Sequence, residues 1–242
     1  MTTMRTIGLL GGMSWESSIL YEQLINTEVR RRLGGMHSAD LVIRSYDFAR
    51  IEALQAAGAW DEAGALLAGD ARRLADAGAD LLVLCTNTMH RVAGAIEAAV
   101  DVPLLHLADA TADAVLAAGM DRVALLGTRF TMEEDFYVAR LARRGLDVVV
   151  PDAAGRDLVH RVIYDELVQG VVRDASRAAY LEVIDGLLAR GAQGVIAGCT
   201  EIELLVTPDD VTCPYFPTTR LHALAAVDAA LATPTTAETS SR

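Results

Sequence analysis

Two short polar turns carry residues whose types could move protons. One is Cys199-Thr200-Glu201, which follows a glycine, and the other is Thr86-Asn87-Thr88. A thiolate can act as a base near neutral pH, whereas a threonine hydroxyl is far less acidic and suits the role of proton donor to a carbanion. Because Cys199 precedes an expected helix start, whose free N–H groups favour an anion, we expect its thiolate to be stabilised there. A thiol and a hydroxyl placed on opposite faces of a carbon atom could remove a proton from one face and return one to the other.

The other two cysteines, Cys85 and Cys213, are expected to be structural. No cysteine lies in a CxxC pair or in a cluster with histidines, so the sequence predicts no metal site. Cys85 directly precedes Thr86 on an expected strand, where neighbouring side chains point to opposite faces. We therefore predict that Cys85 packs as a small hydrophobic residue while Thr86 faces the site.

Both turns follow short apolar segments of the kind that form parallel strands. These segments are continuous apolar runs, as expected for strands that are covered on both faces. They cover residues 6–10, 41–45, 81–85, 104–106, 123–126, 148–150, 195–197 and 215–216. Helical patterns lie between them, over residues 16–33, 61–77, 91–100, 110–118, 132–144, 157–168 and 176–189. The alternation predicts an α/β protein with mainly parallel sheets flanked by helices.

An internal repeat divides this pattern into two similar halves. The run Ile7-Gly-Leu-Leu-Gly11 returns 116 residues later as Val123-Ala-Leu-Leu-Gly127, and residues 78–86 return 113 residues later as 191–199. A single match could reflect the general likeness of helix–glycine–strand junctions, but two matches in the same order favour a repeated α/β unit. The alignment places Cys199 opposite Thr86. Because ligands bind beyond the carboxyl ends of parallel strands, we expect both turns to line one cleft.

Composition and charge exclude several classes of protein. The chain has 242 residues, 52% of them hydrophobic, and its 33 acidic and 21 basic residues give a net charge of −12 at pH 7. This content excludes a chain that is mainly disordered, and the longest basic run, Arg30-Arg31-Arg32, is too short for a nucleic-acid-binding surface. The apolar run at residues 7–10 is too short for a signal peptide, and no segment approaches the roughly 20 apolar residues of a membrane span. We expect a cytoplasmic protein with no nucleic-acid or membrane partner and a disordered tail over residues 234–242.

The motifs resemble those of the aspartate/glutamate racemase family, which comprises cofactor-independent amino-acid racemases. The matching segments are Ile7-Gly-Leu-Leu-Gly-Gly-Met-Ser14, Thr86-Asn-Thr-Met-His90, residues 103–109, residues 126–128, Gly198-Cys-Thr-Glu201 and residues 214–222. The resemblance implies two pseudo-symmetric domains with the active site in the cleft between them, a small amino-acid substrate, no cofactor and a homodimer. We place residues 1–107 with 215–233 in the first domain and residues 108–214 in the second.

The resemblance also implies roles for individual residues. The family's usual first motif is Cys-Asn-Thr, but Thr86 takes the place of its cysteine, whereas the second motif is intact at Cys199. This pattern is similar to that of a subgroup that pairs a threonine with one cysteine and is associated with L-aspartate and L-glutamate. We expect Cys199 to be the base toward the L-substrate and Thr86 to be the proton donor on the opposite face.

Further residues are expected to contact the substrate. They are Met13, Gln55, Asn87, Thr88, Thr128 and Thr200. Thr88 and Thr200 could equally well cap helices, the latter in a capping box with Glu203. For a side-chain carboxylate of the substrate, Arg129 and Arg156 are possible contacts because a guanidinium binds a carboxylate through two hydrogen bonds, although surface positions are commoner for arginine. Val168 stands where some aspartate racemases carry a lysine.

Two alternatives have different chemistry. One is a single-cysteine carbanion enzyme of the same superfamily, such as an arylmalonate-type decarboxylase, since only the second motif keeps its cysteine. The other is a non-catalytic protein that binds a small molecule. Exchange of the substrate's Cα proton with solvent distinguishes a racemase from both.

Overall fold

The computed structural model describes residues 4–232, whose strands form two parallel four-stranded sheets of the same topology. The first sheet contains β1 (Ile7–Gly11), β2 (Leu41–Ser45), β3 (Leu81–Leu84) and β4 (Leu104–Leu105). The second contains β5 (Arg122–Gly127), β6 (Asp147–Val149), β7 (Val195–Gly198) and β8 (Tyr215–Pro217). Their strand orders are β2-β1-β3-β4 and β6-β5-β7-β8. The predicted α/β class with two similar units is therefore confirmed.

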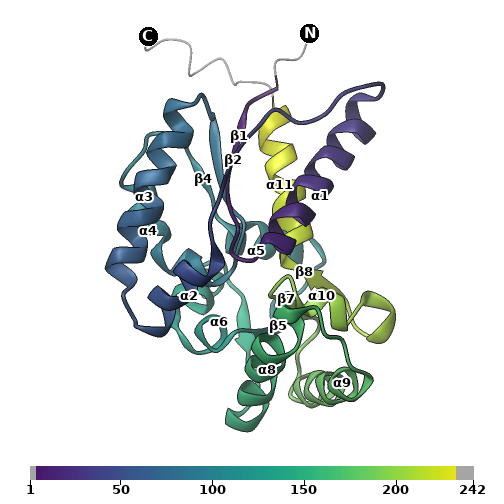
Figure 1. Cartoon of the computed structure of the whole chain (residues 1–242). Coiled ribbons are helices and arrows are strands. Elements are labelled where there is room, and N and C mark those ends of the chain that lie inside the picture. The colour runs from purple at the N-terminus through teal and green to yellow at the C-terminus, as the bar shows by residue number, and fades with distance from the viewer. Residues whose placement is uncertain (1–3, 233–242) are drawn as a thin grey trace.

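Helices cover both faces of the first sheet (Figure 1). They are α1 (Trp15–Leu33), α2 (Phe48–Ala56), α3 (Trp60–Asp76), the short η1 (Thr88–Val92), α4 (Ala93–Glu97) and α11 (Thr218–Leu231). Leu9 and Val83 pack toward α1 and α11, while Leu10 and Leu84 pack toward α2 and α3. Each such burial contributes about 1.5–3 kcal/mol, so alternation along the strands fixes which side of each strand meets which helices.

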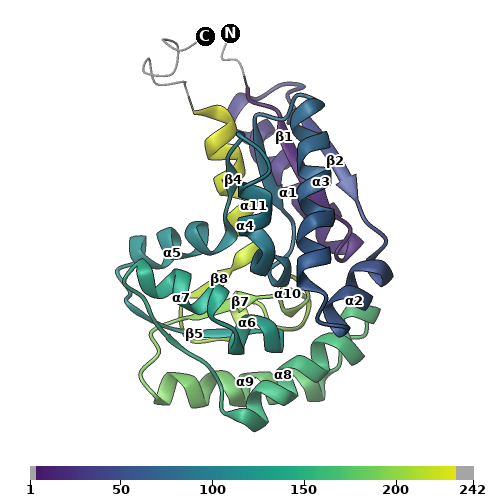
Figure 2. The ribbon, with the colours of Figure 1, turned by 90° about the vertical axis from the view of Figure 1, so that its left-hand side faces the viewer.

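The second sheet is covered in the same way (Figure 2). Its helices are α5 (Leu107–Ala117), α6 (Arg129–Glu133), α7 (Asp135–Arg143), α8 (Ala153–Asp165), η2 (Leu167–Gln169), α9 (Asp174–Ala189), α10 (Ile202–Leu205) and η3 (Pro208–Asp210). Leu125 and Ile196 pack against α5 and α7, whereas Leu126 and Ala197 pack against α8 and α9. We refer to the two sheets with their helices as the first and second lobes.

The register of the two sheets matches the internal repeat. In the first lobe Leu10 lies opposite Leu84, and in the second lobe Leu126 lies opposite Ala197. Since Leu10 and Leu126 are equivalent in the repeat, Leu84 and Ala197 are equivalent as well. Two residues further on, the same alignment pairs Thr86 with Cys199.

The chain crosses between the lobes twice, first from β4 to α5 and then from β8 to α11. Residues 215–217 pair with β7 in the second sheet, with Tyr215 opposite Val195. We expected the chain to return to the first domain at residue 215, but β8 still belongs to the second sheet. The return begins one element later, with α11, which packs on α1. Residues 234–242, which we expected to be disordered, lie outside the described part of the chain.

Some helices differ from expectation. The helical pattern at residues 132–144 is divided at Glu134 into α6 and α7, and α2 and α11 were not predicted. The helix α2 is short and begins with Asp47, whose side chain accepts a hydrogen bond from the Ala49 amide. In contrast, α11 is apolar around much of its surface and lacks a polar face, because both α1 and α5 cover it. Within residues 4–232, no helix combines the length and apolar character needed to cross a bilayer.

Candidate active site

A cavity lies between the lobes, beyond the carboxyl ends of β1, β3, β5 and β7. It has a volume of about 40 Å³ and is lined by Met13, Ser14, Ser17, Phe48, Gln55, Thr86, Asn87, Thr88, Thr128, Ile163, Tyr164, Val168, Cys199, Thr200 and Glu201. Thr86 and Cys199, the two residues expected to be catalytic, are among them. So are the six residues expected to contact the substrate, which are Met13, Gln55, Asn87, Thr88, Thr128 and Thr200. The fold therefore brings together residues that are distant in the sequence, such as Ser14 and Glu201, which are 187 positions apart.

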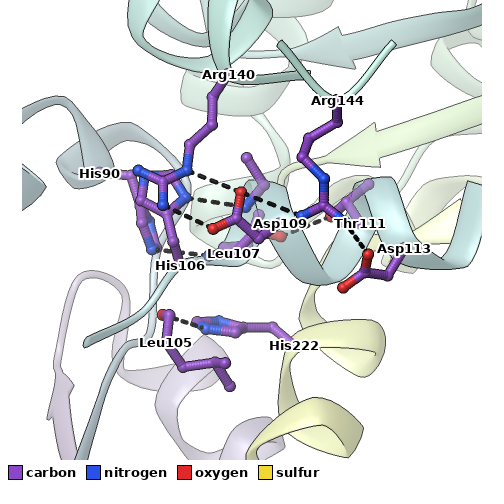
Figure 3. A network of polar contacts seen from close by, with 11 residues as sticks. His90, Leu105, His106, Leu107, Asp109, Thr111, Asp113, Arg140, Arg144 and His222 are labelled. Atoms are coloured by element: carbon purple, nitrogen blue, oxygen red, sulfur yellow. Dashed lines mark hydrogen bonds and ion pairs between the residues drawn. The ribbon is translucent and has the colours of Figure 1, made fainter. Parts of the chain in front are cut away.

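The Thr86 turn is held from behind by a buried histidine. The Nδ1 atom of His90 lies 2.7 Å from the carbonyl oxygen of Thr86. Its Nε2 atom accepts a hydrogen bond from the Leu107 amide at 3.2 Å (Figure 3). One neutral tautomer, protonated on Nδ1, satisfies both contacts. His90 thereby ties the end of β3 to the start of α5.

Two further histidines surround His90 (Figure 3). The ring centroids of His106 and His222 lie 4.4 Å and 5.7 Å from that of His90. Burial lowers the pKa of His90 well below its usual value, and the neighbouring imidazoles of His106 and His222 lower it further. Burial also lowers the pKa of His106 to about 3 and that of His222 to about 4. These three residues, which we call the histidine cluster, are neutral at pH 7.

Polar side chains from both lobes meet at the Thr86 end of the cavity. The Thr88 and Thr128 hydroxyl oxygens lie 3.1 Å apart, and the Asn87 amide nitrogen donates to the Thr218 hydroxyl at 3.1 Å. The Oδ1 atom of Asn87 and the Oε1 atom of Gln55 are buried without a hydrogen-bond partner among the described residues. A buried polar atom without a partner costs about 1–3 kcal/mol. Because both residues line the cavity, a bound ligand could supply the missing donors.

The Cys199 turn has a different set of neighbours. The Cys199 thiol donates to Oε2 of Glu201 at 2.9 Å, and the Ser14 hydroxyl donates to Oε1 of the same carboxylate at 2.7 Å. Ser14 also caps α1 by accepting from the Ser17 amide. Sequence reasoning placed Glu201 within a motif but gave it no task; its position two residues after Cys199 was the available signal.

The environment of Cys199 favours a thiol over a thiolate. Burial raises the pKa of Cys199 well above its usual value, and the negative charge of Glu201 raises it further. The helix expected to stabilise a thiolate is α10, which spans four residues and begins at Ile202. The Glu201 backbone amide does lower the pKa of Cys199, as expected for this turn, but burial and the adjacent carboxylate outweigh it, so the net pKa is raised. The protein thus holds a thiol next to a proton acceptor.

Thr200 links helices rather than capping one. Its hydroxyl oxygen lies 2.8 Å from that of Ser17 on α1 and 2.8 Å from that of Thr219 on α11. No side-chain cap is present at the start of α10, so the capping box with Glu203 does not form. The Thr200 hydroxyl instead holds the Cys199 turn against the first lobe.

Cys85 packs in the core, as predicted. Its side chain is fully buried between the first sheet and the pair α1 and α11. Burial raises the pKa of its thiol above the usual range. Thr86 lines the cavity, whereas Cys85 does not.

The two arginines considered for a side-chain carboxylate are engaged elsewhere. Arg129 donates to Asp157 at 2.9 Å, and Arg156 donates to Glu133 at 2.7 Å. Neither lines the cavity. Sequence reasoning also missed Phe48, Ile163 and Tyr164, which line the cavity. In a sequence, such residues look the same near a site as in the core. Within residues 4–232, no group of three or more His, Cys, Asp or Glu side chains is arranged to hold a metal ion.

Comparisons with known proteins point to one family. Residues 10–226 match the sequence model of the Asp/Glu/Hydantoin racemase family. The structure is similar to that of a candidate Asp/Glu racemase from Yersinia pestis, with 52% identity, a TM-score of 0.90, and coverage of 95% of this chain and 100% of the other. It is also similar to an aspartate racemase homologue from Pyrococcus horikoshii, with 32% identity, a TM-score of 0.81, and coverage of 94% and 99%.

The fold extends to more distant proteins. A glutamate racemase from Francisella tularensis, solved in complex with D-glutamate, has 13% identity and a TM-score of 0.65, with coverage of 93% of this chain and 80% of the other. At this identity the similarity shows a shared fold.

Proposed function

The chain belongs to the Asp/Glu/hydantoin racemase family, and from this premise we propose that it interconverts the L- and D-forms of a free α-amino acid without a cofactor. One observation carries the proposal. Thr86 and Cys199 occupy equivalent positions after β3 and β7, and both line the same cavity. Two equivalent positions on opposite lobes suit two groups that approach one carbon atom from opposite faces.

Cys199 is the base toward the L-substrate in this proposal, and Glu201 prepares it. The thiol proton moves to the Glu201 carboxylate along the 2.9 Å hydrogen bond, and the resulting thiolate takes the Cα proton. A positioned general base contributes about 10²–10⁴ to a rate. The serine contact at 2.7 Å keeps the carboxylate oriented toward the thiol.

Thr86 returns a proton to the opposite face of the carbanion. Its hydroxyl gives a proton to Cα, which yields the D-amino acid, and the hydroxyl regains a proton from solvent. The proton held by Cys199 or Glu201 is released to solvent in turn, so the enzyme returns to its starting state. His90 positions this donor by holding the Thr86 carbonyl at 2.7 Å.

The substrate's α-carboxylate must carry much of the carbanion's charge. The hydroxyls of Thr88 and Thr128 and the side chain of Asn87 stand at the Thr86 end of the cavity and are buried. Donors that are fixed in a water-excluded site stabilise developing charge more than water does. We therefore place the α-carboxylate at this end.

Fewer observations support aspartate or glutamate as the substrate than support the racemase reaction itself. This choice of substrate is supported by the sequence resemblance and by the descriptions of the Yersinia pestis and Pyrococcus horikoshii proteins. The cavity adds no arginine partner for a second carboxylate, since Arg129 and Arg156 are paired with Asp157 and Glu133. Both acidic amino acids therefore belong in the test, together with uncharged ones.

The test is hydrogen exchange at Cα in deuterated water, followed by chiral separation. The wild-type protein should incorporate deuterium and form the opposite enantiomer. Cys199→Ser and Thr86→Ala should each lower exchange at least 100-fold, since each removes one of the two groups. Cys213→Ser is the matched control, because Cys213 is a free thiol that does not line the cavity. Parent-like exchange by Cys199→Ser, with the fold intact, would contradict the proposal.

A decarboxylase of the arylmalonate type is the second candidate. The observation that favours it is the single thiol among the lining residues of the cavity. Such an enzyme would release carbon dioxide from phenylmalonate and would not exchange the Cα proton of an amino acid. A binding protein would retain an amino acid in equilibrium dialysis and catalyse neither reaction.

A further inference from the structure

The cavity has two chemically different sides. Hydroxyl and amide groups occupy the Thr86 end, whereas Phe48 of α2, Ile163 and Tyr164 of α8, and Val168 of η2 contribute aliphatic and aromatic groups, with the Tyr164 hydroxyl as their one polar atom. We call these four residues the apolar wall. Among the lining residues, which all belong to the described chain, Glu201 is the charged one. The side of the cavity left for a substrate side chain is therefore apolar and adjoins a carboxylate.

The arginines of the elements around this wall are paired with carboxylates or lie outside the lining of the cavity. All 21 basic residues of the chain are arginines. Arg129 and Arg156 pair with carboxylates, and Arg173, which follows η2, pairs with Glu166 at 2.9 Å. Arg50 on α2 and Arg161 on α8 are exposed and do not line the cavity. A substrate carboxylate at the wall would lose its water without gaining a counter-charge.

A second cavity adjoins the first at Val168. It has a volume of about 230 Å³ and shares Ser17, Val168, Thr200 and Glu201 with the first. Beyond these residues it is lined largely by aliphatic side chains, among them Ile19, Leu20, Leu167 and Leu204. The space next to Val168 is thus suited to an unbranched side chain several carbon atoms long.

From these contacts we infer that the preferred substrate is an α-amino acid with an uncharged, largely apolar side chain, which lies against Val168 and the α8 wall. The inference rests on the proposed racemase function and names its substrate class. The α-carboxylate occupies the Thr86 end, Cα lies between Thr86 and Cys199, and the side chain extends toward the second cavity. A side-chain carboxylate in that position would face Glu201 as a like charge.

The first experiment compares amino acids that differ in charge but little in shape. Cα exchange in deuterated water is measured for L-glutamine against L-glutamate, L-asparagine against L-aspartate, and L-methionine. We expect kcat/KM for L-methionine and L-glutamine to exceed that for L-glutamate at least tenfold. Equal or faster exchange of L-glutamate or L-aspartate overturns the inference and leaves the proposed function standing. Failure of the folded protein to exchange any of the five contradicts the proposed function itself.

The second experiment places a cation in the wall. Val168→Lys should raise the ratio of kcat/KM for L-glutamate over that for L-glutamine at least tenfold, since the ammonium group can pair with the substrate carboxylate. Val171→Lys adds the same charge at a position that is 37% exposed and outside the cavity, so its ratio should match that of the wild type. Val168→Met tests the site without a charge and should keep the preference for uncharged side chains. An unchanged ratio in folded Val168→Lys, or an equal rise in Val171→Lys, overturns the inference.

Discussion

The ends of β3 and β7 are equivalent in backbone but opposite in chemistry. β3 pairs with β1 in the first sheet as β7 pairs with β5 in the second, and the register of these pairs aligns Thr86 with Cys199. Behind Thr86 lies the neutral histidine cluster, whereas beside Cys199 lies a carboxylate that accepts a hydrogen bond from the thiol. The comparison teaches that the repeated fold fixes where a functional group stands, while the neighbouring side chains decide how readily it holds a proton.

The largest expected effect concerns the stability of the first lobe in acid. Burial lowers the pKa of His106 to about 3 and that of His222 to about 4, and the pKa of His90 is also well below its usual value. As pH falls below about 6.5, the unfolded chain binds protons that the folded protein does not, so stability is lost toward acid. At pH 5 the loss is about 2 kcal/mol for each of His106 and His222, and His90 adds to it in the same direction. Glu203, whose pKa is raised to about 7 by burial, binds a proton in the folded protein over the same range and offsets part of this loss. Urea unfolding at pH 7 and pH 5 measures this difference.

A pair of variants assigns the acid effect to the cluster. His106→Asn should reduce the difference between the two pH values by about 2 kcal/mol, since one buried imidazole is removed. His37→Asn is the control, because His37 is exposed in the connection between α1 and β2 and should leave the difference unchanged. An unchanged difference in His106→Asn, or an equal reduction in His37→Asn, would contradict the assignment of the acid effect to the cluster.

The next effect concerns the second lobe and the proton of Cys199. Glu201→Gln removes both the proton acceptor and the negative charge that helps raise the pKa of Cys199. We expect Cα exchange to fall about 100-fold. The pKa of Cys199 should fall at the same time, so the pH at which iodoacetamide alkylates it should move downward.

Glu203→Gln is the matched control for this variant. Glu203 lies on α10 but does not line the cavity, and burial raises its pKa to about 7. Its replacement should change Cα exchange less than threefold. If both variants lowered exchange equally, the carboxylate beside the thiol would have no special part in the reaction.

The smallest expected effect concerns Cys85, which lies one residue before the position that the internal repeat aligns with Cys199. Cys85→Ala removes a buried sulfur from the core of the first lobe and should cost about 1 kcal/mol of unfolding free energy. Exchange should stay at the wild-type rate, because Cys85 does not line the cavity. Thermal unfolding and the exchange assay measure the two quantities on one sample. A large loss of exchange without a loss of stability would place Cys85 in the reaction and weaken the assignment of Thr86.

Much of the fold follows from the sequence because parallel strands and their stop signals are local patterns. The apolar runs that end at Leu10 and Leu126 were long enough to be found and similar enough to reveal the repeat. By contrast, α11 was not predicted, since a helix covered by α1 and α5 has no polar face to give it a period. Strand β8 was assigned to the first lobe because its pairing with β7 depends on contacts distant in sequence.

The site was predictable where a motif places a residue and not where packing decides its state. The motifs brought Thr86, Cys199 and their turn residues to one cavity. They could not show that the Cys199 thiol faces Glu201 or that burial raises its pKa, because both depend on how closely the lobes pack. For the same reason the apolar wall at Tyr164 was invisible in the sequence.

The two chain crossings lie at one side of the molecule, where His222 of α11 lies 2.9 Å from the Leu105 carbonyl at the end of β4 (Figure 3). Helices α2 and α8 stand at the opposite side (Figure 2). If one lobe rotated about these adjacent crossings, groups near the crossings would move least and groups far from them would move most. Asn87, bonded to Thr218 just after the second crossing, would therefore move little. The same rotation would change the separation of Phe48 and Tyr164 most, because they lie on the helices far from the crossings.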